Sequence, residues 1–245
     1  MNSLLAFFTD NLPSLKSILL GGPPGLAWAY ACLYFAGRLK KYRGLNTGYT
    51  RKIFHFLIFM SAAGVHLVWG LPGVFLFGAA VSLIIFYALF RGDGHLLYEA
   101  MAREKDAPHR TYYILAPYFA TLIGGLAGNF WFGRAALIGY LVAGVGDAIG
   151  EPVGVRFGKH LYRVPSLSRV KSFRSLEGSA AVFLASLAVA IAGAALSPHF
   201  GLAMNALWGI PLLALVCTLV EAFSPHGWDN ALLQVAASFL AVTVL

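Results

Sequence analysis

The stretch GVGDAIGEPVGVRFGK, Gly144 to Lys159, closes an apolar run that begins near residue 134. It carries two carboxylates four residues apart, Asp147 and Glu151, together with five glycines and one proline. The whole run is long enough to cross a bilayer as a helix, which takes about 20 residues. The run therefore indicates a membrane-spanning helix. The two carboxylates near its end raise the question of what function they serve, because charged groups are costly inside a membrane.

The composition of the whole chain agrees with this local pattern. The chain has 245 residues, of which 59% are hydrophobic and only 11% are charged, and its mean hydropathy is +0.73. A soluble domain of this length would need more charge to cover its surface. We therefore expect an all-α fold, a polytopic transmembrane helical bundle that forms a single integral membrane domain over residues 1–245.

Apolar runs of membrane length recur along the chain. We expect about eight spans, within a range of seven to nine, at 17–37, 53–69, 71–90, 111–129, 134–155, 178–197, 205–221 and 230–245. The connections 38–52, 91–110, 156–177 and 222–229 carry polar residues, whereas those near Gly70, Asn129 and Ser197 are short and almost uncharged.

Positive charge is concentrated in three of these connections and their flanks, which hold six, four and six of the 18 Lys and Arg residues. With eight spans, all three connections lie on the same side of the membrane. The positive-inside rule places that side in the cytoplasm and makes the N-terminus extracytoplasmic. This asymmetry accounts for the net charge of +8, so the charge does not indicate a nucleic-acid polymer as a partner.

The polar groups near the spans gather on this same side in four clusters. The first cluster is TRKIFHF, Thr50 to Phe56. On a helix, Arg51 and His55 share a face and Lys52 lies beside them. These residues could contact an anionic substrate. The alternative is an ordinary positive flank whose side chains extend to the lipid headgroups.

The second cluster is the opening stretch. Asp147 lies about 13 Å inside the helix end at Arg156, at 1.5 Å per residue. A charged carboxylate at that depth is costly unless it meets water, a cation or an ionic partner. We expect the helix breakers to open the span, so that oxygens line a cavity suited to Mg²⁺; they are Gly144, Gly146, Gly150, Pro152 and Gly154. The alternative is an internal ion pair with a Lys or Arg.

The third cluster is SRVKSFRSLEGSAAVF, Ser168 to Phe183. It combines cations, hydroxyls and the start of a helix, and such a combination holds polyphosphates. The alternative is a positive cytoplasmic loop followed by an ordinary helix cap at Ser175.

The fourth cluster is VEAFSPHGWDNA, Val220 to Ala231, in a connection without Lys or Arg. Glu221, Asp229 and Asn230 could add metal ligands or bind a substrate hydroxyl. Asp229 and Asn230 are also good N-cap residues for the last span, which is the alternative.

Four blocks of sequence also carry a resemblance to a known family. They are RKIFH (51–55), GDAIGEPVGVRFGK (146–159), KSFRSLEGS (171–179) and VEAFSPHGWDN (220–230). In this order they resemble the CTP-dependent polyprenol kinase family, which includes dolichol kinase, phytol kinase and fungal CTP-dependent diacylglycerol kinase, and which is related to phosphatidate cytidylyltransferase. The resemblance covers about residues 50–231, and the phytol kinase branch is the most similar. Many members carry a small residue or Asp where this chain has Glu151.

The resemblance implies a CTP-dependent phosphotransferase that uses CTP or UTP as donor, with Mg²⁺, and phosphorylates a long-chain prenyl alcohol such as phytol, geranylgeraniol or a polyprenol. Together with the four clusters it assigns catalytic roles to Lys52, His55, Asp147 and Lys171. It assigns nucleotide binding to Arg51, Lys52, Lys159, Lys171, Ser172, Arg174, Glu177, Gly178 and Ser179. Metal binding falls to Asp147, Glu151 and Asp229, with Gly146, Gly150, Gly154, Glu221 and Asn230 as supporting residues.

The same interpretation predicts an integral protein of a bacterial or archaeal cytoplasmic membrane, with its active site on the cytoplasmic side. Its partners would be a lipid alcohol, membrane lipid and a nucleoside triphosphate, and a homo-oligomer is compatible with the sequence. Phosphatidate cytidylyltransferase and diacylglycerol kinase are the nearest alternatives, and the Gly/His/Asp-Arg signature of the former is missing. A membrane transporter is the alternative from another class, but it would place polar groups near the midplane of both halves.

Overall fold

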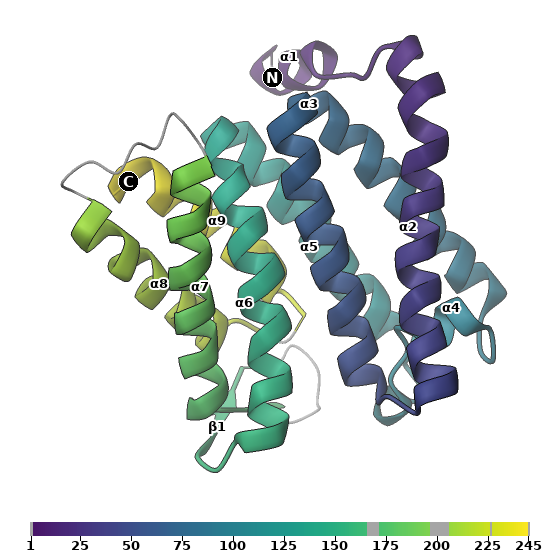
Figure 1. Cartoon of the computed structure of the whole chain (residues 1–245), viewed down its shortest axis with the longest axis vertical. Coiled ribbons are helices and arrows are strands. Elements are labelled where there is room, and N and C mark those ends of the chain that lie inside the picture. Colours follow the sequence, from purple (N-terminus) through teal and green to yellow (C-terminus); the bar gives the residue numbers. More distant parts are fainter. Residues whose placement is uncertain (1, 166–171, 197–205, 226, 245) are drawn as a thin grey trace. The chain divides into compact units, whose positions relative to one another are not determined.

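The computed structural model describes residues 2–165, 172–196, 206–225 and 227–244 (Figure 1). Two compact units divide the chain, Met1–Ile114 and Leu115–Leu245. Helices make up nearly all the regular structure of the described residues in both units, as expected for an all-α chain. The predicted site residue Lys171 and the predicted connection near Ser197 lie outside the described residues.

The first unit contains α1 (Asn2–Asp10), α2 (Leu15–Arg43), α3 (Thr47–Arg91), α4 (Leu96–Glu99) and the short 3₁₀ helix η1 (Glu104–Asp106). Helix α2 begins where the Ser14 hydroxyl accepts a hydrogen bond from the Ser17 N–H, at 3.1 Å. It ends at Gly44, whose φ of 63° lies in the left-handed region that glycine adopts without steric cost. Local capping thus fixes both ends of α2, which then packs lengthwise on α3.

Helix α3 is kinked in its middle. Gly70 has φ 64° and ψ −157°, and Pro72 follows it, so the helical hydrogen bonding is interrupted there. The kink separates the two expected spans 53–69 and 71–90, and Figure 1 shows the two halves of α3 diverging from this point. The prediction of a tight connection near Gly70 is therefore confirmed.

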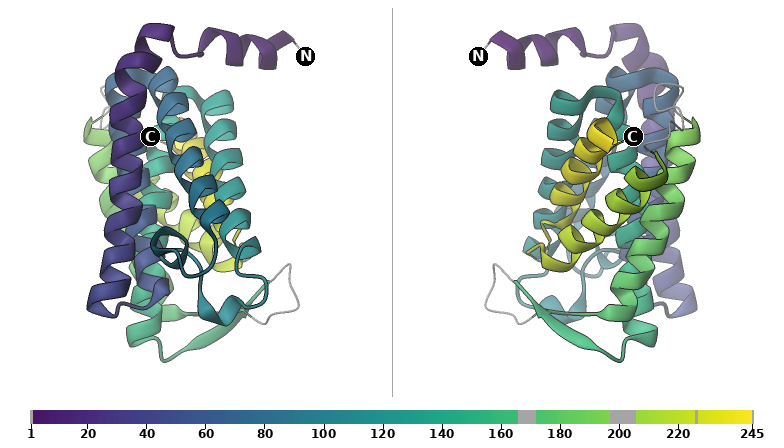
Figure 2. Two further views of the ribbon diagram at one scale, coloured as in Figure 1. Left: turned by 90° about the vertical axis from the view of Figure 1, so that its right-hand side faces the viewer. Right: turned by 90° about the vertical axis from the view of Figure 1, so that its left-hand side faces the viewer.

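The second unit contains most of α5 (Tyr112–Phe132), the 3₁₀ helix η2 (Gly133–Ala135), α6 (Ala136–Phe157), α7 (Leu176–Leu196), α8 (Ala206–Phe223) and α9 (Asp229–Val244). Helix α6 is its core, because it packs on both α7 and α9 and is buried over most of its first four turns. Helix α8 packs on α7 and α9, and the right-hand view of Figure 2 shows α8 and α9 side by side.

A two-stranded antiparallel ribbon lies between α6 and α7. Strand β1 (Leu161–Val164) pairs with β2 (Ser172–Ser175) in a register that sets Tyr162 opposite Arg174. The sequence interpretation missed this ribbon and treated residues 156–177 as an irregular connection. The aromatic and β-branched residues of the two short runs favour strands, but runs of four residues give little signal.

The glycines of the opening stretch have a packing role. A Cβ added to Gly150 would lie 2.5 Å from Cγ2 of Val182, and one added to Gly146 would lie 3.1 Å from Oγ of Ser186. Both partners belong to α7, so the small residues let two helix backbones approach closely, as is common between membrane helices. The prediction that the helix breakers open this span is wrong, because α6 is one helix from Ala136 to Phe157. The prediction named Gly144, Gly146, Gly150, Pro152 and Gly154.

In the described part of the chain, four helical stretches are long and apolar enough to cross a membrane: Leu15–Arg43, Thr47–Arg91, Tyr112–Phe157 and Leu176–Gly193. Two shorter apolar helices, Leu207–Phe223 and Asp229–Val244, accompany them. Each of the eight predicted spans coincides with a helix or with one half of α3. These long apolar helices indicate a membrane protein.

Candidate functional site

The second unit joins two of the predicted clusters through one guanidinium group. Arg174, on β2, bonds from Nε to Oε1 of Glu221 at 3.1 Å and from Nη2 to Oδ2 of Asp229 at 2.9 Å. The three side chains are only 10–15% exposed. Glu221 lies near the end of α8 and Asp229 begins α9, so Arg174 ties the ribbon to both helix ends. We call these three residues the Arg174 cluster.

The Arg174 cluster retains a buried donor. Nη1 of Arg174 is buried and has no hydrogen-bond partner among the described residues. Arginine is well suited to bind phosphate because its planar group presents several N–H donors at once. Nη1 can therefore donate to one further acceptor, and the nucleotide-binding role of Arg174 stays a prediction. Glu221 and Asp229 contribute the carboxylates that orient this guanidinium.

Asp147 and Glu151 lie one turn apart on α6, as the sequence predicts. Asp147 is 5% exposed, although the helix around it is largely apolar, and Glu151 is half-buried. A buried carboxylate in such a helix indicates a functional role more often than it does in a soluble core.

Asp147 and Glu151 offer two carboxylates to a metal ion. Among the described residues, no three His, Cys, Asp or Glu side chains gather closely enough to hold a metal. Mg²⁺ commonly takes one or two carboxylates and completes its shell with phosphate oxygens and water. Asp147 and Glu151 fit that requirement. Asp229 fits it less well, because its Oδ2 bonds Arg174 and its Oδ1 accepts a hydrogen bond from the Asn230 N–H.

The start of α7 is fixed by local hydrogen bonds. The Ser175 hydroxyl accepts from the Gly178 N–H at 3.1 Å, which is the cap that the sequence left open as an alternative. Glu177 bonds Nδ1 of His160 at 2.8 Å, and the Ser179 hydroxyl bonds the Tyr162 hydroxyl at 2.6 Å. These residues hold the ribbon against α7. Lys159, just beyond α6, is exposed to solvent.

The first predicted cluster lies on α3 in the first unit. Lys52 is buried, with 7% exposure, while Arg51 and His55 are partly exposed. The His55 ring lies 4.4 Å from the Phe59 ring, measured between centroids. A buried lysine is unlike a positive flank that extends to lipid headgroups, so the burial of Lys52 favours a specific role.

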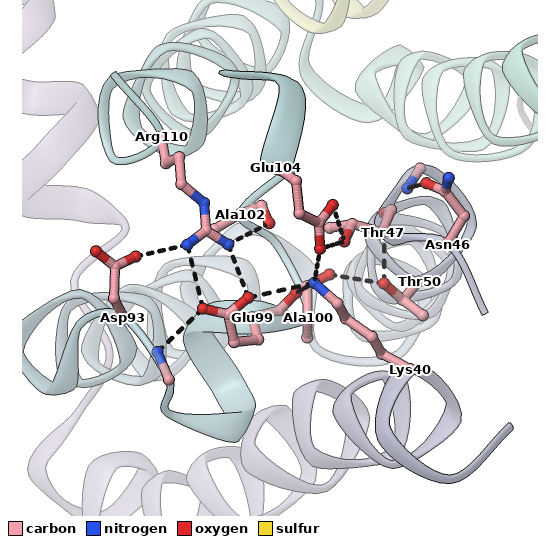
Figure 3. A network of polar contacts seen from close by, with 12 residues as sticks. Lys40, Asn46, Thr47, Thr50, Asp93, Glu99, Ala100, Ala102, Glu104 and Arg110 are labelled. Atoms are coloured by element: carbon pink, nitrogen blue, oxygen red, sulfur yellow. Dashed lines mark hydrogen bonds and ion pairs between the residues drawn. The ribbon is translucent and has the colours of Figure 1, made fainter. Parts of the chain in front are cut away.

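A second polar network, shown in Figure 3, lies in the first unit and was not anticipated. Glu99, at the end of α4, accepts from Nη2 of Arg110 at 2.7 Å, from Nζ of Lys40 at 3.3 Å and from the Gly94 N–H at 3.0 Å. Lys40 also bonds Glu104 at 2.6 Å. These contacts hold the connection after α3 against the end of α2. We call them the Glu99 network.

The Glu99 network keeps its central acid ionised. Burial by itself would raise the pKa of Glu99, but the hydrogen bonds from Arg110, Gly94 and Lys40 lower it to about 2. The pKa of Glu104 is lowered as well, mainly by its hydrogen bond from Lys40. A carboxylate that receives several donors is held in one position, which is the behaviour of a structural clamp.

Several polar side chains lie along α9 in the second unit, and the sequence interpretation missed most of them. Asn230 donates from Nδ2 to Oγ1 of Thr121 at 3.0 Å, and Gln234 donates to the Thr121 carbonyl at 3.2 Å. Ser238 follows one turn later and bonds the Gln234 carbonyl at 2.6 Å. The spacing Asn230, Gln234 and Ser238 is the signal that was available. Gln234 and Ser238 therefore add buried polar groups beyond the four predicted clusters.

The chain is thus a helical membrane protein with buried ionisable groups both at helix ends and within α6. It is similar to a curated phytol kinase of Synechocystis sp., with 32% identity over 127 residues. The match covers 51% of this chain and 52% of the Synechocystis protein, so the chain spans about half the length of the relative it matches. No family model and no solved structure matches the chain.

Proposed function

We propose that this protein is a CTP-dependent lipid-alcohol kinase that phosphorylates a long-chain prenyl alcohol. The observation that carries the proposal is the Arg174 cluster, in which a buried guanidinium with a spare donor lies between two carboxylates at helix ends. The similarity to a phytol kinase and the buried Asp147 support it further.

The residues divide the work of phosphoryl transfer, which consists mostly of positioning and charge neutralisation. Arg174 binds phosphate oxygens of the nucleotide through Nη1. In the second unit, the cations Lys159 and Lys171 add positive charge for the triphosphate. The bond between the γ-phosphorus and its bridging oxygen to the β-phosphate breaks, and the alcohol oxygen forms a new bond to that phosphorus. The leaving group is CDP.

Asp147 has two tasks in this proposal. With Glu151 it would hold Mg²⁺, which neutralises charge on the phosphates when it is bound. Asp147 also lies deep enough in α6 to orient the hydroxyl of an alcohol that enters from the bilayer. The proton of that hydroxyl passes to a carboxylate or imidazole base, for which Asp147, His55 and Asp229 are the candidates.

The membrane arrangement follows from the charge pattern. We propose that the eight apolar helical segments cross the membrane and that the N-terminus lies outside the cytoplasm. The Lys- and Arg-rich connections then face the cytoplasm, where CTP or UTP is available. Arg174 lies in the third of these connections, and Glu221 and Asp229 lie at the ends of α8 and α9 beside the connection 222–229. The same topology puts both connections on the cytoplasmic side, so the nucleotide reaches the Arg174 cluster without crossing the bilayer.

The test uses purified protein in lipid micelles with Mg²⁺ and CTP. One reaction carries label on the γ-phosphate and a second carries label on the α-phosphate. Each reaction contains a mixture of prenyl alcohols, diacylglycerol and phosphatidic acid. The proposal predicts γ-label in a prenyl phosphate. Label from the α-phosphate in the lipid would instead identify a cytidylyltransferase, and γ-label in phosphatidic acid would identify a diacylglycerol kinase.

A further inference from the structure

The second unit carries an apolar groove between α8 and α9. The groove has a volume of about 540 Å³, within the range of ligand-binding pockets. Its walls include Phe223 from α8, Leu232, Ala236 and Phe239 from α9, and Trp131 from the end of α5. Ser224, just beyond α8, also lines it, but its hydroxyl donates to the carbonyl of Val220 on α8. The walls therefore offer a ligand mainly apolar contact.

The α8 and α9 residues at one end of the groove are close in sequence to two members of the Arg174 cluster. Glu221 directly follows Val220, which lines the groove on α8. Asp229 lies three residues before Leu232, on the same side of α9, because residues three apart on a helix are neighbours. Both carboxylates bond Arg174. The groove thus leads away from the charged groups along the apolar helices.

The far end of the groove is aromatic. The rings of Phe132 and Phe239 meet edge to face with their centroids 5.9 Å apart, and both residues line the groove, as does Trp131. From Leu232 to Phe239 the wall extends about 10 Å along α9, at 1.5 Å per residue. This is about a third of the thickness of a bilayer core, which is roughly 30 Å.

We propose that this groove binds the first isoprene units of the alcohol substrate, with the hydroxyl end of the chain toward Asp229, one of the candidate bases. The inference rests on the proposed function and adds where the substrate lies. A chain with one polar end and an apolar remainder matches a groove with one charged end and apolar walls. Because the groove is short, it holds only the part of the chain nearest the hydroxyl, and the rest of a long chain lies in the bilayer.

The first experiment maps binding without requiring turnover. The intact protein in phosphatidylcholine vesicles is illuminated with a prenyl alcohol that carries a diazirine on its first isoprene unit. Labelled peptides should include Phe223, Leu232 and Ala236, and excess unlabelled geranylgeraniol should remove that labelling. Labelling spread evenly over lipid-facing residues, or unaffected by the competitor, would overturn the inference.

The second experiment fills the groove. Ala236→Trp should raise KM for a long prenyl alcohol by about tenfold or more, as expected when a pocket loses a good fit. Ala188→Trp, on an exposed position of α7 outside the groove, is the matched control and should leave KM unchanged. Ala236→Leu gives a smaller filling if the Trp variant does not fold. Equal KM values for the folded groove-filling variant and the Ala188 variant would overturn the inference.

The two proposals fail in different ways. If the protein transfers phosphate but labelling avoids the groove, the groove inference falls and the proposed function stands. If labelling concentrates in the groove but no nucleotide supports transfer to a prenyl alcohol, the groove is a prenyl-alcohol site and the proposed function falls.

Discussion

The Glu99 network and the Arg174 cluster use the same chemistry in opposite arrangements. In the first, one carboxylate is surrounded by the cations Lys40 and Arg110. In the second, one guanidinium lies between the carboxylates of Glu221 and Asp229. Arg110 uses both of its Nη groups and leaves only Nε without a partner, whereas Arg174 leaves a whole Nη1 group free among the described residues.

The difference separates a structural role from a binding role. The Glu99 network joins a connection to a helix end, and each partner is fixed by several others. Thr47 and Thr50 add bonds to Glu104 and to the Ala100 carbonyl (Figure 3). The Arg174 cluster holds its guanidinium in position but keeps donor capacity for a further anion. Substitutions in the Glu99 network should therefore lower stability, whereas substitutions in the Arg174 cluster should also lower activity.

The largest effect is expected for Asp147→Asn. The amide keeps the shape of the side chain but cannot carry the negative charge that the proposed function requires. Turnover of a prenyl alcohol should fall by about 100- to 1,000-fold or more. Size-exclusion elution and the melting temperature should stay close to those of the wild type. Turnover near the wild-type value would contradict the role of Asp147.

A smaller but still large effect is expected for Arg174→Lys. An ammonium cannot donate to two carboxylates and a phosphate with the geometry of a guanidinium. Turnover should fall by about 100-fold, and breaking the buried pairs should cost about 3 kcal/mol of stability. Arg163→Lys is the matched control, since Arg163 lies exposed on the neighbouring strand β1. If both variants behave alike, the geometry of the guanidinium is irrelevant.

Glu99→Gln should affect stability and leave catalysis unchanged. It removes charge-assisted hydrogen bonds from Arg110 and Lys40, which should cost about 1–3 kcal/mol of stability. Turnover per folded molecule should remain at the wild-type level. Asp93→Asn removes a pair to Arg110 whose carboxylate is 74% exposed, so it should cost less than about 1 kcal/mol. A loss of turnover without a loss of stability in Glu99→Gln would contradict the structural role.

The smallest effect is the pH dependence of the Glu99 network. The pKa of Glu99 is depressed from about 4.5 to about 2. The network therefore contributes fully to the stability of the fold above pH 4.5 and loses this contribution as the pH falls toward 2. Melting temperatures of the wild type and of Glu99→Gln should therefore converge below about pH 4.5. A constant difference between the two proteins down to about pH 3 would contradict this pKa.

Much of the helical architecture follows from hydropathy. Each predicted span corresponds to a helix or half-helix, and the kink at Gly70 lies where two spans were expected to meet. Strong apolar periods and a glycine at a left-handed position give local signals that a sequence carries by itself. The ribbon gave no such local signal, because two runs of four residues become strands only through their pairing with each other.

The site was predicted less completely. Arg174, Glu221 and Asp229 were recognised as polar groups near spans, but their pairing depends on how β2, α8 and α9 pack, and hydropathy says nothing of that. The glycines near Asp147 were interpreted as helix breakers. In a helix that packs tightly on a neighbour, the same residues provide close contact, and sequence alone does not distinguish the two uses. The Glu99 network was missed because it depends on how Lys40, near the end of α2, packs against the connection after α3.

The most direct test of the central claim is a single-turnover transfer of the γ-phosphate from CTP to a prenyl alcohol. It is measured per folded molecule for the wild type, Asp147→Asn, Arg174→Lys and Glu99→Gln. The account predicts equal transfer by the wild type and Glu99→Gln, much less by Arg174→Lys, and the least by Asp147→Asn. Wild-type transfer by Asp147→Asn, or a loss in Glu99→Gln as large as in Arg174→Lys, would contradict it.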